Sequence, residues 1–257
     1  MFFYTSFILD MKPPIITLVI LFLGFHSLNA HENYPVGARP QALSNAFISI
    51  SDTWSMFHNQ AGISGLNQFS AGIFYESRFL VEELSLTAGA IIIPVKAGVF
   101  GFGFYQFGEG TYKENKLGLA FAKQLTQHLS FGIQLDYFSN RLPENSKHFG
   151  FATFEAGIIY SPNKKLFIGG HVFNPVLNGF ETLEGKTKSP TIFRVGGHYQ
   201  FDEIVLIIVE IQKDLINPLH LKTGIEFSPV QNLHLRFGVS GKPVNYTAGL
   251  GFTFRKI

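Results

Sequence analysis

The sequence contains no cysteine among its 257 residues. This absence excludes a disulfide framework and any metal site built on thiolates. Charged residues are also scarce, since they make up 15% of the chain, whereas soluble domains usually have about a quarter. The formal net charge is only +2 and no basic run interleaves with aromatic residues. The composition therefore gives no support for nucleic acid as a partner.

Long hydrophobic runs are missing too, except for one near the N-terminus. Residues 15–25 are apolar, follow a positively charged start at residues 11–12, and precede Ala30, a small residue suited to cleavage. A helix that spans a bilayer needs about 20 apolar residues. We therefore expect residues 1–30 to be a signal peptide rather than a membrane anchor. Met11 is an alternative start, because the signal pattern begins there.

Alternation between apolar and small or polar residues is what the chain has in abundance. Near the C-terminus, Tyr246, Leu250 and Phe252 alternate with Thr247 and Gly251. A period of two predicts a strand with one apolar and one polar face. The pattern repeats over most of the chain, so it suits a barrel in lipid with an apolar outside and a wet lumen.

From residue 67 onward this alternation predicts about twelve strands. Their expected positions are 67–75, 83–93, 97–107, 112–124, 129–139, 148–160, 165–174, 191–201, 203–213, 218–228, 232–240 and 244–255. The predicted fold is all-β, an antiparallel transmembrane β-barrel of about 12 strands over residues 67–257. The links are alternately short and mostly longer, as in transmembrane barrels. Residues 175–190 form the longest and most polar link and are expected at the outer rim.

Residues 31–66 break the strand pattern and are predicted to form a short N-terminal helical plug inside the barrel. Ser51 or Asp52 is suited to cap a short helix that runs through residue 57, and residues 59–62 have the composition of a turn. The expected plug residues are Trp54, Met56, Phe57, Asn59 and Gly62.

Charged residues on the polar strand faces are expected to point into the lumen. They are Asp136, Glu155, Arg194, Glu210, Lys222, Glu226 and Arg236. Their signs are mixed, so they give no strong field of one sign of the kind that selects ions. We therefore favour a role in holding the plug over conduction of a solute. If Glu210 points inward, Leu206 and Ile208 do so by alternation, and both then need a dry partner.

No motif for catalysis, a cofactor or a metal stands out, so we predict none of the three. Gly101 and Gly103 lie inside a strand that no helix follows, which argues against a dinucleotide site. Glycine there instead lets the plug backbone approach. Glu226 and His234 can face each other across a turn, either as a metal site or proton relay or, as we favour, within a solvated face of paired charges. No Ser–His pair lies at a convincing cross-strand register, which argues against a hydrolase.

One stretch resembles a known family. Residues 37–64 read GARPQALSNAFISISDTWSMFHNQAGIS and are similar to the N-terminal region of FadL-like outer-membrane barrels, most of all the PorV/PorQ branch of Bacteroidetes-type bacteria. The similarity continues through barrel segments such as NKLGLAFAKQL and FEAGIIY. It implies a strand over residues 47–50. The family motif usually reads Asn-Pro-Ala-Gly, and Gln60 stands here in the proline position, which makes the turn less rigid.

The same resemblance implies about fourteen strands and an aromatic C-terminus. This chain has about twelve predicted strands and ends with residues 255–257, Arg-Lys-Ile. Either the barrel closes with twelve strands, since bacterial barrels span a wide range of even numbers, or the reading frame lacks a final hairpin.

Two functions follow from the resemblance. The PorV/PorQ branch implies an accessory or shuttle component of a type IX-like secretion system in the outer membrane of a Gram-negative bacterium. The FadL relation implies the alternative, a passive transporter of hydrophobic small molecules with a ligand pocket beneath Trp54, Met56 and Phe57, although simple packing also explains this cluster. An outer-membrane enzyme is the least favoured class. Expected partners are outer-membrane lipid and either secretion-machine proteins or hydrophobic small molecules.

Overall fold

The described part of the chain covers most of the protein. The computed structural model describes residues 33–78, 80–110, 112–141, 148–182, 185–215, 218–241 and 243–254. The expected signal peptide and residues 255–257 lie outside these ranges. No helix in the described ranges is long and apolar enough to cross a membrane.

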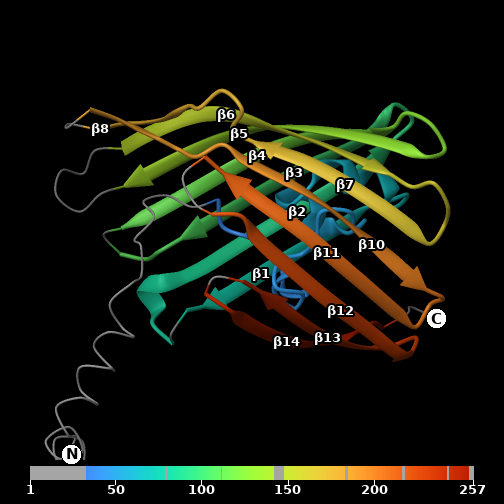
Figure 1. The fold of residues 1–257 in the computed structure, drawn as a ribbon. Coiled ribbons are helices and arrows are strands. Elements are labelled where there is room, and N and C mark those ends of the chain that lie inside the picture. The colour runs from blue at the N-terminus through green and yellow to red at the C-terminus, as the bar shows by residue number, and fades with distance from the viewer. Residues whose placement is uncertain are drawn as a thin grey trace, which may run out of the picture. The chain divides into compact units, whose positions relative to one another are not determined.

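Twelve antiparallel strands form one large sheet in the order β1-β2-β3-β4-β5-β6-β7-β10-β11-β12-β13-β14 (Figure 1). The strands are β1 Ser70–Ser77, β2 Ser85–Val95, β3 Gly98–Phe107, β4 Lys113–Gln124, β5 Leu129–Arg141, β6 His148–Tyr160, β7 Leu166–Phe173, β10 Ile192–Phe201, β11 Val205–Asp214, β12 His220–Val230, β13 Leu233–Ser240 and β14 Asn245–Phe252. Each of the twelve predicted strands is present, with every end within three residues of its expected position. The predicted all-β antiparallel fold is confirmed.

Residues 175–190 differ from the prediction of a plain loop. They contain a separate two-stranded hairpin, β8 (Gly179–Thr182) and β9 (Gly185–Lys188), whose strands pair with each other. A hairpin satisfies its own backbone groups without joining the large sheet, which lets a long link stay compact. Phe180 of this hairpin is buried, so the link is attached to the body of the protein by an apolar contact.

The two faces of the sheet differ as the alternation predicts. On β3, Phe100, Phe102 and Phe104 are exposed, whereas the intervening Gly101 and Gly103 are buried. The same contrast recurs on the other strands, where the exposed face carries leucine, isoleucine, valine and aromatic side chains. An apolar outer face of this extent is what a bilayer requires of a barrel.

The links between strands are shorter at one end of the sheet than at the other. At the short-link end they contain two to five residues, as in residues 96–97 and 161–165. At the long-link end they range from four residues (241–244) to eighteen (174–191), and the first of them carries the short helix η3 (Glu82–Leu84). This asymmetry is typical of transmembrane barrels.

The segment that precedes β1 lies against the concave face of the sheet, and we call residues 34–66 the inner segment (Figure 1). It contains the helix α3 (Ala38–Ala42) and two 3-10 helices, η1 (Thr53–Phe57) and η2 (Gln60–Gly65). The helix α3 packs on β13 and β14, η1 on β1 to β3, and η2 on β3 to β6. The inner segment thus contacts both edges of the sheet and much of its middle.

Candidate functional site

The two 3-10 helices of the inner segment are fixed by side-chain caps. Asp52 caps η1 by accepting from Trp54 N, and Ser55 completes a capping box by accepting from Asp52 N. Asn59 caps η2 by accepting from Ala61 N at 3.1 Å. These caps satisfy backbone donors that a helix start leaves free. The turn that the sequence predicts after Phe57 is therefore the start of a second short helix.

Asn59 and Gln60 also connect the inner segment to the sheet. Asn59 Nδ2 donates to Ile48 O at 2.6 Å and to Ile158 O on β6 at 3.1 Å. Gln60 Nε2 donates to Glu155 Oε2, also on β6, at 3.0 Å. Gln60, at the position where the motif that this segment resembles has proline, therefore provides a buried hydrogen bond that a proline side chain cannot donate.

Residues 47–50 form a turn and not the strand that the family resemblance implies, so that expectation is wrong. The physical reason is the hydrogen-bond partner of their backbone N–H groups. Phe47 N and Ile48 N donate to Glu210 Oε2 on β11 at 2.9 and 3.1 Å. The carboxylate thus accepts the hydrogen bonds that the carbonyl groups of a neighbouring strand would accept in a sheet.

Glycines of the sheet make room for the inner segment. A Cβ at Gly72 would lie 2.9 Å from Trp54 Cζ2, and one at Gly224 would lie 2.8 Å from Leu43 Cβ. Eight further inward glycines meet the inner segment in the same way: Gly101, Gly103, Gly132, Gly157, Gly169, Gly196, Gly238 and Gly249. The prediction that strand glycines let the N-terminal backbone approach is confirmed at Gly132, Gly169 and Gly238. At Gly101 and Gly103 the approaching atoms are instead side-chain atoms of Met56 and Phe57.

The apolar residues of the expected plug lie in the core. Met56 and Phe57 are buried, Trp54 is partly buried, and Gly62 is packed so closely that a Cβ there would lie 2.8 Å from Ser55 Oγ. On the other side of the lumen, Leu206 and Ile208 pack with Leu43, Ala46, Phe47 and Ile50 of the inner segment. The dry partner that these two β11 side chains require is thus the inner segment.

Glu210 and Lys222 form a buried pair on adjacent strands. Lys222 Nζ lies 3.1 Å from Glu210 Oε1 and donates to Gln212 Oε1 at 2.8 Å. Because Glu210 Oε2 accepts from the inner segment, the carboxylate has partners on both oxygens.

Glu226 is the centre of a second ionic group, near the short-link end. Arg39 of α3 holds its carboxylate with two hydrogen bonds of 2.8 Å, and Arg236 of β13 donates to it from the other side. Arg39 also binds Asp52 at 2.9 Å. Arginine suits such a bidentate grip on a carboxylate.

Glu155 is the centre of a third group, in which every side chain is buried. It accepts from Lys116, from His171 Nε2 at 2.9 Å and from Gln60, while Lys116 Nζ lies 3.4 Å from Asp136 Oδ1. In each of the three groups, opposite charges of the strands pair with each other. Each group also has a hydrogen bond or an ion pair to the inner segment.

Arg194 differs from the other buried charges. Its side chain is buried, and its Nε has no hydrogen-bond partner among the described residues. On the neighbouring strands it is paired in register with His171 and Gln212. The structure brings together six of the seven predicted lumen charges in close ion pairs, and Arg194 stands outside these groups.

His58 is a buried residue that the sequence analysis did not single out. Its Nε2 donates to Val36 O at 3.0 Å, and its Nδ1 has no partner in the described part of the chain. Burial lowers the pKa of His58 to about 3, and the positive charge of Arg194 adds to this effect. No sequence signal marks His58, because its environment comes from contacts between distant segments.

An aromatic cluster fills the lumen near the long-link end. Phe138 stacks on Phe151 with ring centroids 4.9 Å apart and meets Phe173 edge-on at 5.8 Å. Phe180 of the hairpin packs edge-on against Phe151 at 4.6 Å. The aromatic cluster lies towards the long links and borders the Glu155 group, since Lys116 Nζ lies 5.3 Å from the centroid of the Phe138 ring. The Glu226 group lies towards the short links.

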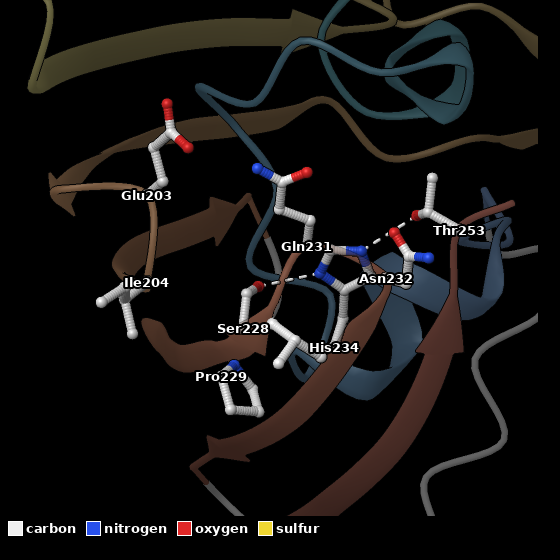
Figure 2. A pocket seen from close by; sticks show the side chains of 9 residues that line it. Glu203, Ile204, Ser228, Pro229, Gln231, Asn232, His234 and Thr253 are labelled. Carbon is white, nitrogen blue, oxygen red and sulfur yellow. Dashed lines mark hydrogen bonds between the residues drawn. The ribbon is translucent and has the colours of Figure 1, made fainter. Parts of the chain in front are cut away.

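A pocket of about 410 Å³ opens at the short-link end (Figure 2). Ser228 Oγ lies 2.8 Å from His234 Nδ1, and His234 Nε2 lies 3.0 Å from Thr253 Oγ1. The sequence analysis found no Ser–His pair at a convincing register, and this expectation is wrong. The reason is the strand register: Glu226 pairs with Arg236 and Phe227 with Leu235, which places Ser228 opposite His234.

The pocket is polar, and its side chains do not form a catalytic or metal site. Both ring nitrogens of His234 are occupied by hydroxyl groups, and no carboxylate among the described residues completes a triad with it. Glu226 pairs in register with Arg236 and not with His234, so the less favoured alternative of a Glu–His site does not form, and Glu226 is instead one of a pair of opposite charges. No group of three potential metal ligands occurs in the described ranges.

Comparison with known proteins bears on the fold. The sequence matches no protein-family model and no curated protein. The toluene transporter TodX of Pseudomonas putida has a similar structure, with a TM-score of 0.61 at 12% identity over 89% of this chain and 91% of TodX. A FadL homologue of Pseudomonas aeruginosa gives a TM-score of 0.58 at 11% identity, covering 86% and 87% of the two chains.

These likenesses define the class of fold. The chain has the fold of FadL-like transmembrane β-barrels, with twelve strands in its sheet and the inner segment on the concave face. At such low identity the comparison carries the fold alone, and function has to be argued from the site.

Proposed function

We propose that this protein is a passive transporter of small apolar molecules in the outer membrane of a Gram-negative bacterium. The apolar outer face and the FadL-like fold support the location. The aromatic cluster near the long-link end is the observation that carries the function. Aromatic rings attract one another by offset stacking and edge-to-face contacts, so these rings are suited to contact an aromatic or aliphatic solute that enters from the long-link side.

We propose that the inner segment acts as a plug. It fills the lumen between the aromatic cluster and the short-link end, and three ionic groups attach it to the sheet or surround it. Passage therefore requires the inner segment, or the wall beside it, to move. Solved structures of similar fold are described as a toluene transporter and a monoaromatic hydrocarbon channel, which agrees with a small apolar solute.

The expected secretion role has weaker support. It rests on the sequence resemblance to the PorV/PorQ branch, and no contact or surface of the described residues favours it. Passive transport is for this reason the function we propose. We retain the prediction that residues 1–30 are a signal peptide, which N-terminal sequencing of the envelope-extracted protein tests.

Uptake of toluene by a Gram-negative host without its own hydrocarbon channels tests the proposal. We expect faster uptake in cells that produce the protein than in cells that do not. Phe151→Ala should raise the toluene concentration needed for half-maximal uptake, because it removes two ring contacts. Phe193→Ala, on the outer face, is the matched control and should not.

Two outcomes would overturn transport. In one, cells with and without the protein take up toluene at the same rate although equal amounts of the barrel reach the membrane. In the other, deletion of the gene in its own host stops secretion of cargo with a C-terminal signal and leaves apolar uptake unchanged.

A further inference from the structure

A hollow of about 440 Å³ lies on the outer face of β2, β3, β4 and β5. Its sides are two rows of outward side chains that pair in register across these four strands. The row nearer the short-link end consists of Ile93, Phe100, Phe121 and Ile133, and the next row includes Leu119. Every lining residue is apolar, so in the outer membrane the hollow opens onto hydrocarbon.

Gly98 explains why the wall is hollowed at this place. A Cβ at Gly98 would lie 2.7 Å from Phe121 Cζ, so the tip of the Phe121 ring occupies the space that a side chain at residue 98 would fill. The Phe121 ring thus points towards the short-link end and away from Leu119 in the next row. Phe100 packs against it, with the two ring centroids 5.0 Å apart. The hollow between the two rows is therefore fixed by packing within the wall.

Two lysines lie at the short-link end of the hollow. The register of β3 and β4 places Lys123 opposite Gly98, one outward position beyond Phe121. Lys96 lies in the two-residue link between β2 and β3, and both lysines are exposed. A lysine stem lies along apolar surface while its ammonium group reaches the water interface. The two ammonium groups are therefore available where the end of the hollow meets the interface.

Carboxylates are missing from this side of the wall. Residues 91–104, 119–133 and 157–170 include the short-link ends of β2 to β7 and contain no Asp or Glu. The same three stretches contain four lysines, Lys96, Lys123, Lys164 and Lys165. Among the described residues, Lys165 alone of the four has an ion-pair partner, which is Asp202 at 2.9 Å. Uncompensated positive charge thus lies beside the apolar hollow.

We propose that this hollow, together with Lys123 and Lys96, is a binding site for one anionic phospholipid. An acyl chain lies in the hollow against Phe100 and Phe121, and the lipid phosphate binds the two ammonium groups. The short-link end of a bacterial barrel faces the periplasm, where the membrane leaflet consists of phospholipid. Lipid binding at this site does not depend on solute transport.

The charges of the wall favour an anionic headgroup over a zwitterionic one. A zwitterionic headgroup brings its own ammonium group close to Lys123 and Lys96, and no carboxylate of these stretches is present to receive it. Like charges at such a distance repel each other. An anionic headgroup has the phosphate alone and gains from both lysines.

Native mass spectrometry of the purified protein in detergent tests the site. Phosphatidylglycerol and phosphatidylethanolamine with the same acyl chains are titrated in separate experiments, and the mass of each complex gives the number of lipids retained. We expect one phosphatidylglycerol to be retained more tightly than the following ones, and more tightly than any phosphatidylethanolamine.

Two substitutions separate the effect of charge from that of shape. Lys123→Gln should weaken the binding of phosphatidylglycerol about fivefold, as expected for one lysine near a membrane surface. Lys188→Gln, in the exposed part of the hairpin at the other end, is its control and should not. Leu119→Trp fills the hollow and leaves both lysines in place, so it should remove the tightly bound lipid. Val209→Trp, on the outer face of β11, is the matched control for shape.

Three results would overturn the lipid site. The first is equal affinity for the two lipids, or an affinity for phosphatidylglycerol that Lys123→Gln leaves unchanged. The second is tight binding that persists in Leu119→Trp, because the acyl chain would then lie elsewhere. The third is a dimer that retains no lipid, which would assign the hollow to a second copy of the chain.

Discussion

Glu210 shows how a single side chain holds the inner segment to the wall. It has no exposed surface, and it accepts from two backbone N–H groups and from Lys222. Glu210→Gln removes the charge and leaves Lys222 buried without its partner ion. We expect a loss of about 3–5 kcal/mol in the free energy of unfolding, measured by denaturant unfolding in lipid vesicles.

Glu203 provides the control for this substitution. It lies in an exposed short link beside the pocket of Figure 2, so Glu203→Gln should change the unfolding free energy by less than about 0.5 kcal/mol. Equal effects of the two substitutions would show that the Glu210 contacts do not stabilise the fold.

His58 makes the stability of the interior depend on pH. Its pKa is about 3 in the folded protein, because burial and the charge of Arg194 disfavour the cation, and its ordinary value is 6.5. The unfolded chain therefore binds a proton that the folded one excludes, and stability falls as pH drops below 6.5. Nearby Glu210 opposes this shift and Lys222 reinforces it.

The His58→Gln variant isolates this effect. Between about pH 6.5 and 4.5 the wild type should lose roughly 2–3 kcal/mol more than the variant, at about 1.4 kcal/mol per pH unit. Denaturant unfolding at the two pH values measures it. Parallel losses in both proteins would mean that His58 is protonated in the folded state.

At the scale of elements, the glycines of the strands decide how closely the inner segment can approach. A Cβ at Gly169 on β7 would collide with the backbone of Ile48, whereas one at the adjacent Gly170 would make an ordinary contact with Ile158 at 3.5 Å. Gly169→Ala should therefore destabilise the protein by about 1–3 kcal/mol. Gly170→Ala should be nearly neutral in the same unfolding assay, and the reverse order would place the inner segment elsewhere.

The positions of the strands were largely predictable from the sequence. The side-chain contacts between distant segments were not. A period of two locates strands because the pleat itself has that period, and it assigned residues such as Phe252 to the outer face. It carries no information on contacts such as Arg39 with Glu226, which lie 187 residues apart. The register that places Ser228 opposite His234, and the turn at residues 47–50, likewise depend on pairing and tertiary contacts that a local pattern does not contain.

At the scale of the whole molecule, the interior combines two environments in one barrel. Aromatic side chains fill it towards the long links, while the Glu226 ionic group lies towards the short links. The inner segment contacts both environments and both edges of the sheet. The proposed transport and its selectivity both depend on closure of the lumen by this segment.

Single-channel recording in planar bilayers shows whether the inner segment closes the lumen. The intact protein should show no stable open pore, because the inner segment and its ion pairs fill the lumen. Deletion of residues 35–62 removes α3, η1 and the start of η2 and should raise the conductance to that of an open barrel. A stable open pore in the intact protein, unchanged by the deletion, would show that the inner segment lies outside the lumen and does not close it.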